Sequence, residues 1–205
     1  MIKAVIFDYG GVMKSSHPLS MDIATIYNIS VEEVEKVKKI TTPFFSLLQR
    51  GLINEQEFWQ KFSDAIKKPI PQNYKELLRE IYEKTLVLFP EMIEFVKKLK
   101  DKGIKTAVLS NITKFQAEII RKNNGYKEFD VLVLSYEEKL EKPELNIYLS
   151  VIKKLGVEPE ECVFIDDKEK NLAPAKSLGM KTVLAKNSGQ IIKDVFSIIN
   201  LPNRF

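Results

Sequence analysis

The sequence has 205 residues, of which 44% are hydrophobic and 29% are charged, which is enough for a globular domain with a sizeable core. A single cysteine, Cys162, excludes an internal disulfide framework, and a single histidine, His17, excludes a multi-histidine metal centre. The net charge of +4 comes from lysines interleaved with apolar residues at helical spacing, so we expect solvated helix faces and no nucleic-acid surface.

Apolar runs along the chain are all short. None approaches the roughly 18 to 20 apolar residues of a membrane span. The first run, residues 4–7, ends at Asp8 and is too short for the apolar segment of a signal peptide. We therefore expect a cytoplasmic protein with no membrane partner.

Five apolar runs have the pattern of strands that are buried on both faces. Each is short and continuous, and most end in polar or turn-forming residues. They cover residues 4–7, 106–109, 131–134, 163–165 and 182–184. Amphipathic segments between the later runs predict helices over residues 91–102, 114–123, 144–155 and 172–178.

Residues 15–86 break this alternation and predict helices only. Ser30 with Glu33, and Asn54 with Glu57, have the spacing of capping boxes at helix starts, and residues 74–86 form a further amphipathic run. This segment also carries aromatic residues that we interpret as its own core: Phe44, Phe45, Phe58, Trp59 and Phe62.

Alternating strands and helices predict an α/β fold with a doubly wound, Rossmann-like parallel sheet. We expect residues 1–14 and 87–205 to form this core, with residues 15–86 inserted as an α-helical cap. Ligands of such sheets bind beyond the carboxyl ends of the strands. Asp8, Ser110 and the pair Asp166 and Asp167 all occur at such ends.

Together with Lys142, these residues have complementary chemistry. Asp8 supplies a carboxylate nucleophile, Ser110 a hydroxyl beside backbone N–H donors, and Lys142 a fixed cation. Two adjacent carboxylates, Asp166 and Asp167, repel each other unless a cation lies between them. This set fits phosphoryl transfer through an aspartyl-phosphate.

Over almost the whole chain the sequence resembles the haloacid dehalogenase superfamily. The matching segments are residues 6–12, 108–111, 141–143 and 164–167, followed by Asn171. Residues 142–148 and 171–180 are most similar to the branch with the phosphatase domain of soluble epoxide hydrolases and bacterial sugar-phosphate phosphatases.

The resemblance implies a role for each matched residue. Asp8 would be the nucleophile, and the phosphate would be held by Ser110, Asn111 through its backbone, and Lys142. A Mg²⁺ cofactor would be bound by Asp8, the Gly10 carbonyl and Asp167, with Asp166 binding directly or through water. Asn171 stands where the family often has an acidic residue that supports the metal ligands.

Gly10 departs from the family pattern. Phosphatases of the superfamily usually carry an aspartate at this position as general acid and base, which is worth about 10² to 10⁴ in rate. His17 is the residue that could replace it, although a hinge residue before Pro18 is the simpler interpretation.

Three functions remain open. The first is a Mg²⁺-dependent phosphatase that acts on a small organic phosphate, such as a sugar phosphate, and that is slowed by Gly10. The second is a catalytically silent relative that binds a phosphorylated ligand or protein partner. The third is haloacid dehalogenation, which the pair Asp166 and Asp167 argues against. The sequence leaves the oligomeric state open.

Overall fold

A computed structural model describes residues 1–200; residues 201–205, the end of the expected core segment, lie outside the described residues. Five parallel strands form one sheet in the order β3-β2-β1-β4-β5. All five predicted strands are confirmed, with ends that differ by at most one residue. Their bounds are β1 Ala4–Phe7, β2 Lys105–Ser110, β3 Val131–Leu134, β4 Cys162–Asp166 and β5 Lys181–Leu184.

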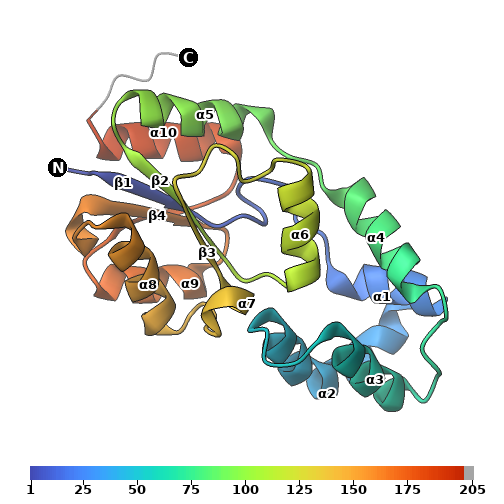
Figure 1. The fold of residues 1–205 in the computed structure, drawn as a ribbon. Helices are drawn as coiled ribbons and strands as arrows, with labels where there is room; N and C mark the ends of the chain where they lie inside the picture. The colour runs from blue at the N-terminus through green and yellow to red at the C-terminus, as the bar shows by residue number, and fades with distance from the viewer. Residues whose placement is uncertain (201–205) are drawn as a thin grey trace.

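Helices cover both faces of the sheet. On one side lie α5 (Pro90–Asp101) and α10 (Ser188–Ile198), and on the other α8 (Leu145–Leu155) and α9 (Glu169–Ser177) (Figure 1). Side chains of the central strand β1 alternate between the two faces of the sheet. Val5 and Phe7 pack with α5, whereas Ala4 and Ile6 pack with α8. The α/β doubly wound class is therefore confirmed, although the sequence analysis did not predict α10.

Three shorter elements complete the core. They are α6 (Lys114–Lys122), α7 (Ser135–Glu138) and a 3₁₀ turn, η1 (Pro159–Glu161). Thr113 and Gln116 form a capping box at the start of α6, so the preceding residues Ser110 and Asn111 are not needed as its cap.

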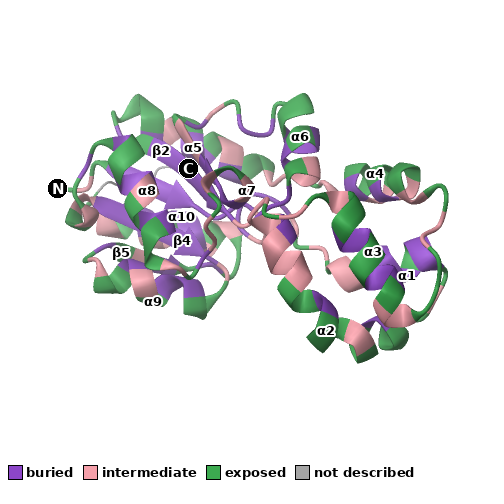
Figure 2. Cartoon of the chain, turned by 60° about the horizontal axis from the view of Figure 1, so that its bottom comes forward, coloured by how far each residue is buried: buried purple, intermediate pink, exposed green. Residues whose placement is uncertain are grey.

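Residues 15–86 contain four helices beside the sheet: α1 (Leu19–Tyr27), α2 (Val31–Gln49), α3 (Glu55–Ile66) and α4 (Tyr74–Thr85). Both predicted capping boxes, at Ser30 and at Asn54, are present. These helices enclose an apolar cluster of their own, in which Phe58, Trp59 and Phe62 are buried. Figure 2 shows buried residues gathered in the sheet layer and again on α1, α3 and α4.

The carboxyl-terminal end of α2 docks on loops of the core. Ser135 Oγ donates to the Gln49 carbonyl at 2.6 Å, and Lys139 Nζ donates to the Gly51 carbonyl at 2.7 Å. Arg50 forms an ion pair of 3.2 Å with Glu144. Polar bonds therefore fix one end of the helical layer against the loops that follow β3.

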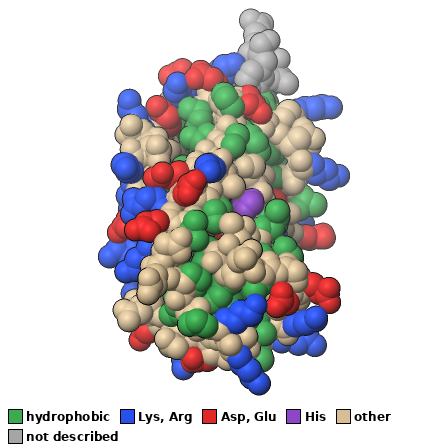
Figure 3. Space-filling view, turned by 90° about the vertical axis from the view of Figure 1, so that its right-hand side faces the viewer, with side chains coloured by type: hydrophobic (Ala, Val, Ile, Leu, Met, Phe, Trp, Pro, Cys, Tyr) green, Lys and Arg blue, Asp and Glu red, His purple; other side chains and the backbone are tan. Residues whose placement is uncertain are grey.

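Charges of both signs are interspersed on the face shown in Figure 3, without a continuous basic band. Across residues 1–200, no helix combines the length and the apolar character that crossing a bilayer requires.

Candidate active site

Three strand ends bring the candidate residues together. β1 lies between β2 and β4, with Phe7 opposite Val108 on one side and Ile165 on the other. Asp8 directly follows β1, and its backbone N–H donates to the Ile165 carbonyl at 2.8 Å. Because parallel strands end at the same edge, Asp8 lies between Ser110 at the end of β2 and Asp166 at the end of β4.

Lys142 connects two of these carboxylates. Its Nζ lies 2.8 Å from Asp8 Oδ1 and 2.7 Å from Asp166 Oδ2, and its side chain is 1% exposed. Burial opposes the charge of Lys142, but the two carboxylates outweigh it and raise the pKa of this lysine. Burial raises the pKa of Asp8 to about 6, against the lowering effect of Lys142. The two side chains therefore form a tight buried ion pair.

Asn111 fixes the backbone that carries Lys142. Its side-chain amide donates to the Lys142 carbonyl at 2.9 Å, and its Oδ1 accepts from the Lys142 N–H at 2.8 Å. Gln49 of α2 donates in turn to the Asn111 carbonyl at 3.3 Å. From the sequence we expected only a backbone role for Asn111, because nothing local in the sequence indicates which distant peptide its side chain contacts.

Asp166 is fully enclosed by hydrogen-bond donors. Its Oδ1 accepts from the Lys168 N–H at 2.8 Å, and both of its oxygens accept from the Asn171 amide, at 2.9 and 3.0 Å. With Lys142 as a further donor, these oxygens are already satisfied. Asn171 therefore orients Asp166 through its amide NH₂ group, whereas its buried Oδ1 has no hydrogen-bond partner among residues 1–200.

Asp167 has the opposite character. Its Oδ1 is buried and has no hydrogen-bond partner among residues 1–200. Ligand atoms of Asp8, Asp166 and Asp167 all lie within 4.8 Å of one another. Burial raises the pKa of Asp167, against the lowering effect of Lys168. A buried, unsatisfied carboxylate oxygen in such a group fits a hard divalent cation that takes oxygen ligands.

Gly10 and Gly11 differ in the space around them. A Cβ built on Gly10 would meet no atom within 4 Å, so the position that usually holds an aspartate is open. Gly11 has a φ of +80°, and a Cβ there would lie 2.7 Å from Asp167 Oδ2. Gly11 is therefore needed for the close approach of Asp167, whereas the space beside Gly10 could hold a side chain.

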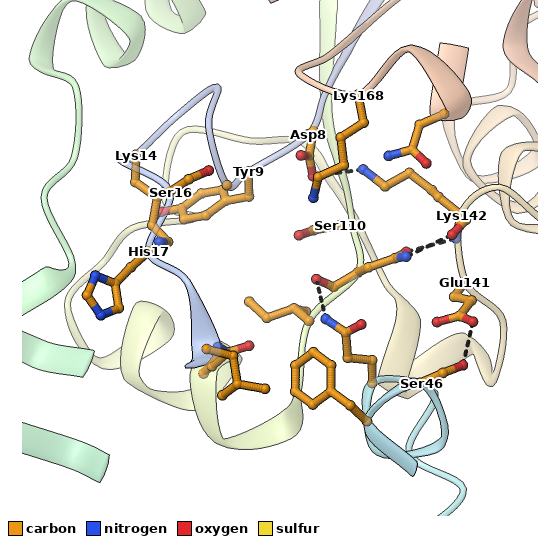
Figure 4. A pocket seen from close by; sticks show the side chains of 18 of the residues that line it. Asp8, Tyr9, Lys14, Ser16, His17, Ser46, Ser110, Glu141, Lys142 and Lys168 are labelled. Atoms are coloured by element: carbon orange, nitrogen blue, oxygen red, sulfur yellow. Dashed lines mark hydrogen bonds and ion pairs between the residues drawn. The ribbon is translucent and has the colours of Figure 1, made fainter. Parts of the chain in front are cut away.

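A cavity of about 450 Å³ lies between this edge of the sheet and the four-helix layer. Figure 4 shows Asp8, Ser110 and Lys142 on one side of it, with Lys14 and His17 on the other. The buried Ser110 contributes to the wall, as does Phe45 of α2. Of the five aromatic residues interpreted as core of the inserted segment, Phe45 also faces this cavity.

His17 has a partner that the sequence did not reveal. Its Nε2 lies 2.7 Å from Asp22 Oδ1, on α1. Burial raises the pKa of Asp22, whereas His17 and Lys14 lower it. His17 lines the same cavity as Gly10 but is bound to Asp22, and Figure 4 places it across from Asp8.

Two further residues in the cavity wall were not identified from the sequence. Lys14 is 7% exposed although it is charged, and Asp22 is 4% exposed. The only sequence signal for Lys14 is that a lysine follows the apolar pair Val12 and Met13 near the candidate nucleophile.

The chain is similar to known proteins in sequence and in fold. A family model described as haloacid dehalogenase-like hydrolase matches residues 2–179. The chain is 29% identical over 190 residues to the phosphorylated carbohydrates phosphatase of Thermotoga maritima, covering 89% of this chain and 84% of that protein. It is 28% identical over 209 residues to acyl-CoA dehydrogenase family member 10 of Mus musculus, covering 98% of this chain but 19% of that longer protein.

Among solved structures, a haloacid dehalogenase family enzyme from Bacteroides thetaiotaomicron superposes with a TM-score of 0.78 at 25% identity. The match covers 95% of this chain and 98% of the other. The fold is therefore the one expected from the sequence. This chain belongs to the haloacid dehalogenase-like hydrolase family.

Proposed function

We propose that the protein is a Mg²⁺-dependent phosphomonoester hydrolase that acts on a small organic phosphate through a phosphorylated Asp8. The observation that carries this proposal is the contact of 2.8 Å between Lys142 Nζ and Asp8 Oδ1, beside a cluster of three carboxylates. A nucleophile, a fixed cation and an oxygen-rich metal site then meet at one end of a cavity.

In the first step, a carboxylate oxygen of Asp8 attacks phosphorus and the ester P–O bond breaks. The electron pair leaves with the ester oxygen, which takes a proton from water. In the second step, the oxygen of a water molecule attacks the phosphorus of the aspartyl-phosphate. Inorganic phosphate leaves, the water proton passes to solvent, and the Asp8 carboxylate is restored.

The remaining residues would hold the transferring group. Lys142 would donate to a non-bridging phosphate oxygen, together with the Ser110 hydroxyl and the Asn111 backbone N–H. Fixed donors of this kind stabilise charge that develops in the transition state. Asn111 would have a second role, because its side chain fixes the Lys142 backbone.

The donor set fits Mg²⁺ as the cofactor. Asp8, Asp167 and the Gly10 carbonyl would bind the ion, and the satisfied oxygens of Asp166 favour contact through water. Once bound, the ion offsets the negative charge of the phosphate and of the attacking carboxylate. A relative with a TM-score of 0.77 and 25% identity has been crystallised with magnesium and inorganic phosphate.

Gly10 would limit the reaction to good leaving groups or to slow turnover, because no carboxylate at this position protonates the ester oxygen. We further propose that residues 15–86 act as a cap that admits substrate and excludes water, with the core formed by the rest of the chain. The separate apolar cluster enclosed by these four helices supports this division.

The decisive experiment is a phosphate-release assay on an aryl phosphate, with and without Mg²⁺. We expect release that depends on Mg²⁺ and is abolished by Asp8→Asn, a variant that keeps the shape but removes the nucleophile. Release that is absent from the wild-type protein, or unchanged in Asp8→Asn, would contradict the proposal.

Gly10 also favours a second candidate, a catalytically silent protein that binds a phosphorylated ligand at this site. In that case, phosphate esters would raise the melting temperature in the presence of Mg²⁺ without being hydrolysed. Rapid turnover of any phosphate ester would exclude this candidate.

A further inference from the structure

Lys14 lies in the cavity wall beside the open position at Gly10. Its backbone pairs with this loop: the Gly11 N–H donates to the Lys14 carbonyl at 2.8 Å, and the Lys14 N–H donates to the Tyr9 carbonyl at 3.2 Å. These bonds fix the lysine within the turn that follows the candidate nucleophile. Its side chain lines the same cavity as Asp8.

The ammonium group of Lys14 has only neutral partners nearby. It donates to the Ser15 carbonyl at 2.8 Å and lies 5.6 Å from the centre of the Tyr82 ring. Within residues 1–200, no carboxylate lies within ion-pair distance of it. Burial lowers the pKa of Lys14, and the more distant Asp8 and Asp22 act in the opposite direction.

Such an arrangement is unusual for a buried cation. A charge that is removed from water is costly unless it is paired, and an ammonium group has three donors, of which the Ser15 carbonyl takes one. Lys168 and Lys170 also line the cavity, but both are exposed, so water solvates their charges. Of the cavity lysines that form no ion pair in the described part of the chain, Lys14 is therefore the one that gains most from an anionic ligand.

From its position, Lys14 would contact the organic part of a substrate and not the phosphoryl group that is transferred to Asp8. A phosphorus atom under attack lies about 3 to 3.5 Å from the nucleophilic oxygen. Lys142 reaches Asp8 at 2.8 Å, whereas Lys14 does not come within ion-pair distance of it. Figure 4 shows Lys14 across the cavity from Lys142, on the side of His17.

The balance of charge supports the same assignment. Asp8, Asp166 and Asp167 carry three negative charges, which Lys142 and a divalent cation would cancel. These charges cancel, whereas the other charged residues of the cavity add up to one positive charge: Lys14, Asp22, Glu141, Lys168 and Lys170. Lys14 is the buried lysine of this second set, and Figure 4 places it on the side of His17.

We infer that Lys14 is a specificity-determining residue, whose ammonium group binds an anionic oxygen on the organic part of the substrate. The site then selects phosphate monoesters that carry a carboxylate close to the ester bond. This inference rests on the proposed function and names the class of ester for the same site.

Two probes of nearly equal shape test it: 3-phosphoglycerate, which carries a carboxylate, and glycerol 3-phosphate, which carries a hydroxymethyl group in its place. We expect the wild-type protein to favour the carboxylate ester about tenfold or more in kcat/KM, the effect of one charge-assisted hydrogen bond. Lys14→Gln should remove this preference, and Lys14→Arg should keep part of it.

Two further lysine variants serve as controls. Lys36→Gln removes a surface lysine of α2 that pairs with Glu32, and it tests the loss of net charge alone. Lys168→Gln removes an exposed lysine at the cavity. A preference that survives in Lys14→Gln, or that is lost in Lys168→Gln instead, would overturn the inference.

A binding measurement separates this inference from the proposed function. Asp8→Asn with Mg²⁺ should bind 3-phosphoglycerate more tightly than glycerol 3-phosphate, measured by calorimetry, and the double variant with Lys14→Gln should bind both alike. Selective binding without turnover in the wild-type protein would refute hydrolysis and keep the role of Lys14. Turnover of both esters without preference would refute the role of Lys14 and keep hydrolysis.

Discussion

The Asn111 side chain and the Lys142 backbone form a closed pair of hydrogen bonds, with lengths of 2.8 and 2.9 Å. The pair joins the loop after β2 to the segment before α8, which are separated by 31 residues. Lys142 reaches Asp8 because its backbone is held at this point.

We therefore predict that Asn111→Ala lowers kcat/KM for phosphate release by about 10- to 100-fold, because a displaced Lys142 no longer holds the transferring group. The Asn111 backbone N–H is retained in this variant, so the loss would report on the side chain alone. Steady-state kinetics on an aryl phosphate measure the effect. Activity within twofold of the wild type would show that the backbone of Lys142 is fixed by other contacts.

Lys142→Met should be strongly destabilising. It leaves Asp8 and Asp166 buried without their cation, a change that costs about 3 to 5 kcal/mol in free energy of unfolding. Urea denaturation measures the loss. Combining it with Asp8→Asn should recover part of the stability, because one of the two uncompensated charges is removed.

Lys168→Met is the matched control for this experiment. Lys168 is exposed and its side chain forms no ion pair in the described part of the chain, so the variant should change stability by less than about 0.5 kcal/mol. An equal loss in both variants would contradict the special role of the buried ion pair.

Gly10→Asp should raise the rate of phosphate release. The structure has room for a side chain there, and a positioned carboxyl group contributes about 10² to 10⁴ to rate. We expect a gain of at least about tenfold with an alkyl phosphate and a smaller gain with an aryl phosphate, whose leaving group needs less protonation. Gly10→Asn has nearly the same shape without the acid and should show no gain.

Gly11→Ala provides a contrast at the neighbouring position. Its Cβ would lie 2.7 Å from Asp167 Oδ2, at a φ of +80° that alanine rarely adopts. We expect a loss of about 1 to 3 kcal/mol in stability, together with weaker Mg²⁺ binding. Melting temperatures recorded over a Mg²⁺ titration test both effects, and a Mg²⁺ response equal to that of Gly10→Ala would contradict them.

Glu55 should make stability depend on pH. Burial, with a contribution from Glu118, raises its pKa from 4.5 to about 6. The unfolded chain then loses its proton at lower pH than the folded protein, so this residue's contribution to stability falls as pH rises from 4.5 to about 6 and is constant above. Relative to Glu55→Gln, the wild type should lose about 1 kcal/mol over that range, allowing for partial exposure. Denaturation curves of both proteins at several pH values provide the test, and parallel pH profiles would contradict it.

Much of the core could be predicted from the sequence, because strands that are buried on both faces leave continuous apolar runs. β1 and β3 have the predicted bounds, and helix α8 begins only one residue later than expected. Helices α1 and α10 were not predicted. Chain order alone did not give the order of strands, which depends on how the helices pack against the sheet.

The residues of the candidate site that follow strand ends were predicted from the sequence. The prediction was incomplete for the rest of the site. Asp8, Ser110 and Asp166 come together because adjacent parallel strands end at one edge. Lys14 and Asp22 were not predicted as cavity residues, because their surroundings depend on how the inserted helices lie against the core.

Gln49 connects the position of α2 to the position of Lys142. Its side chain donates to the Asn111 carbonyl, and Asn111 holds Lys142. A displacement of α2 from the core would break the bond to Asn111 and so release one restraint on Lys142, which contacts Asp8. A form of the protein in which α2 is displaced from the core would therefore hold the contact between Lys142 and Asp8 less firmly.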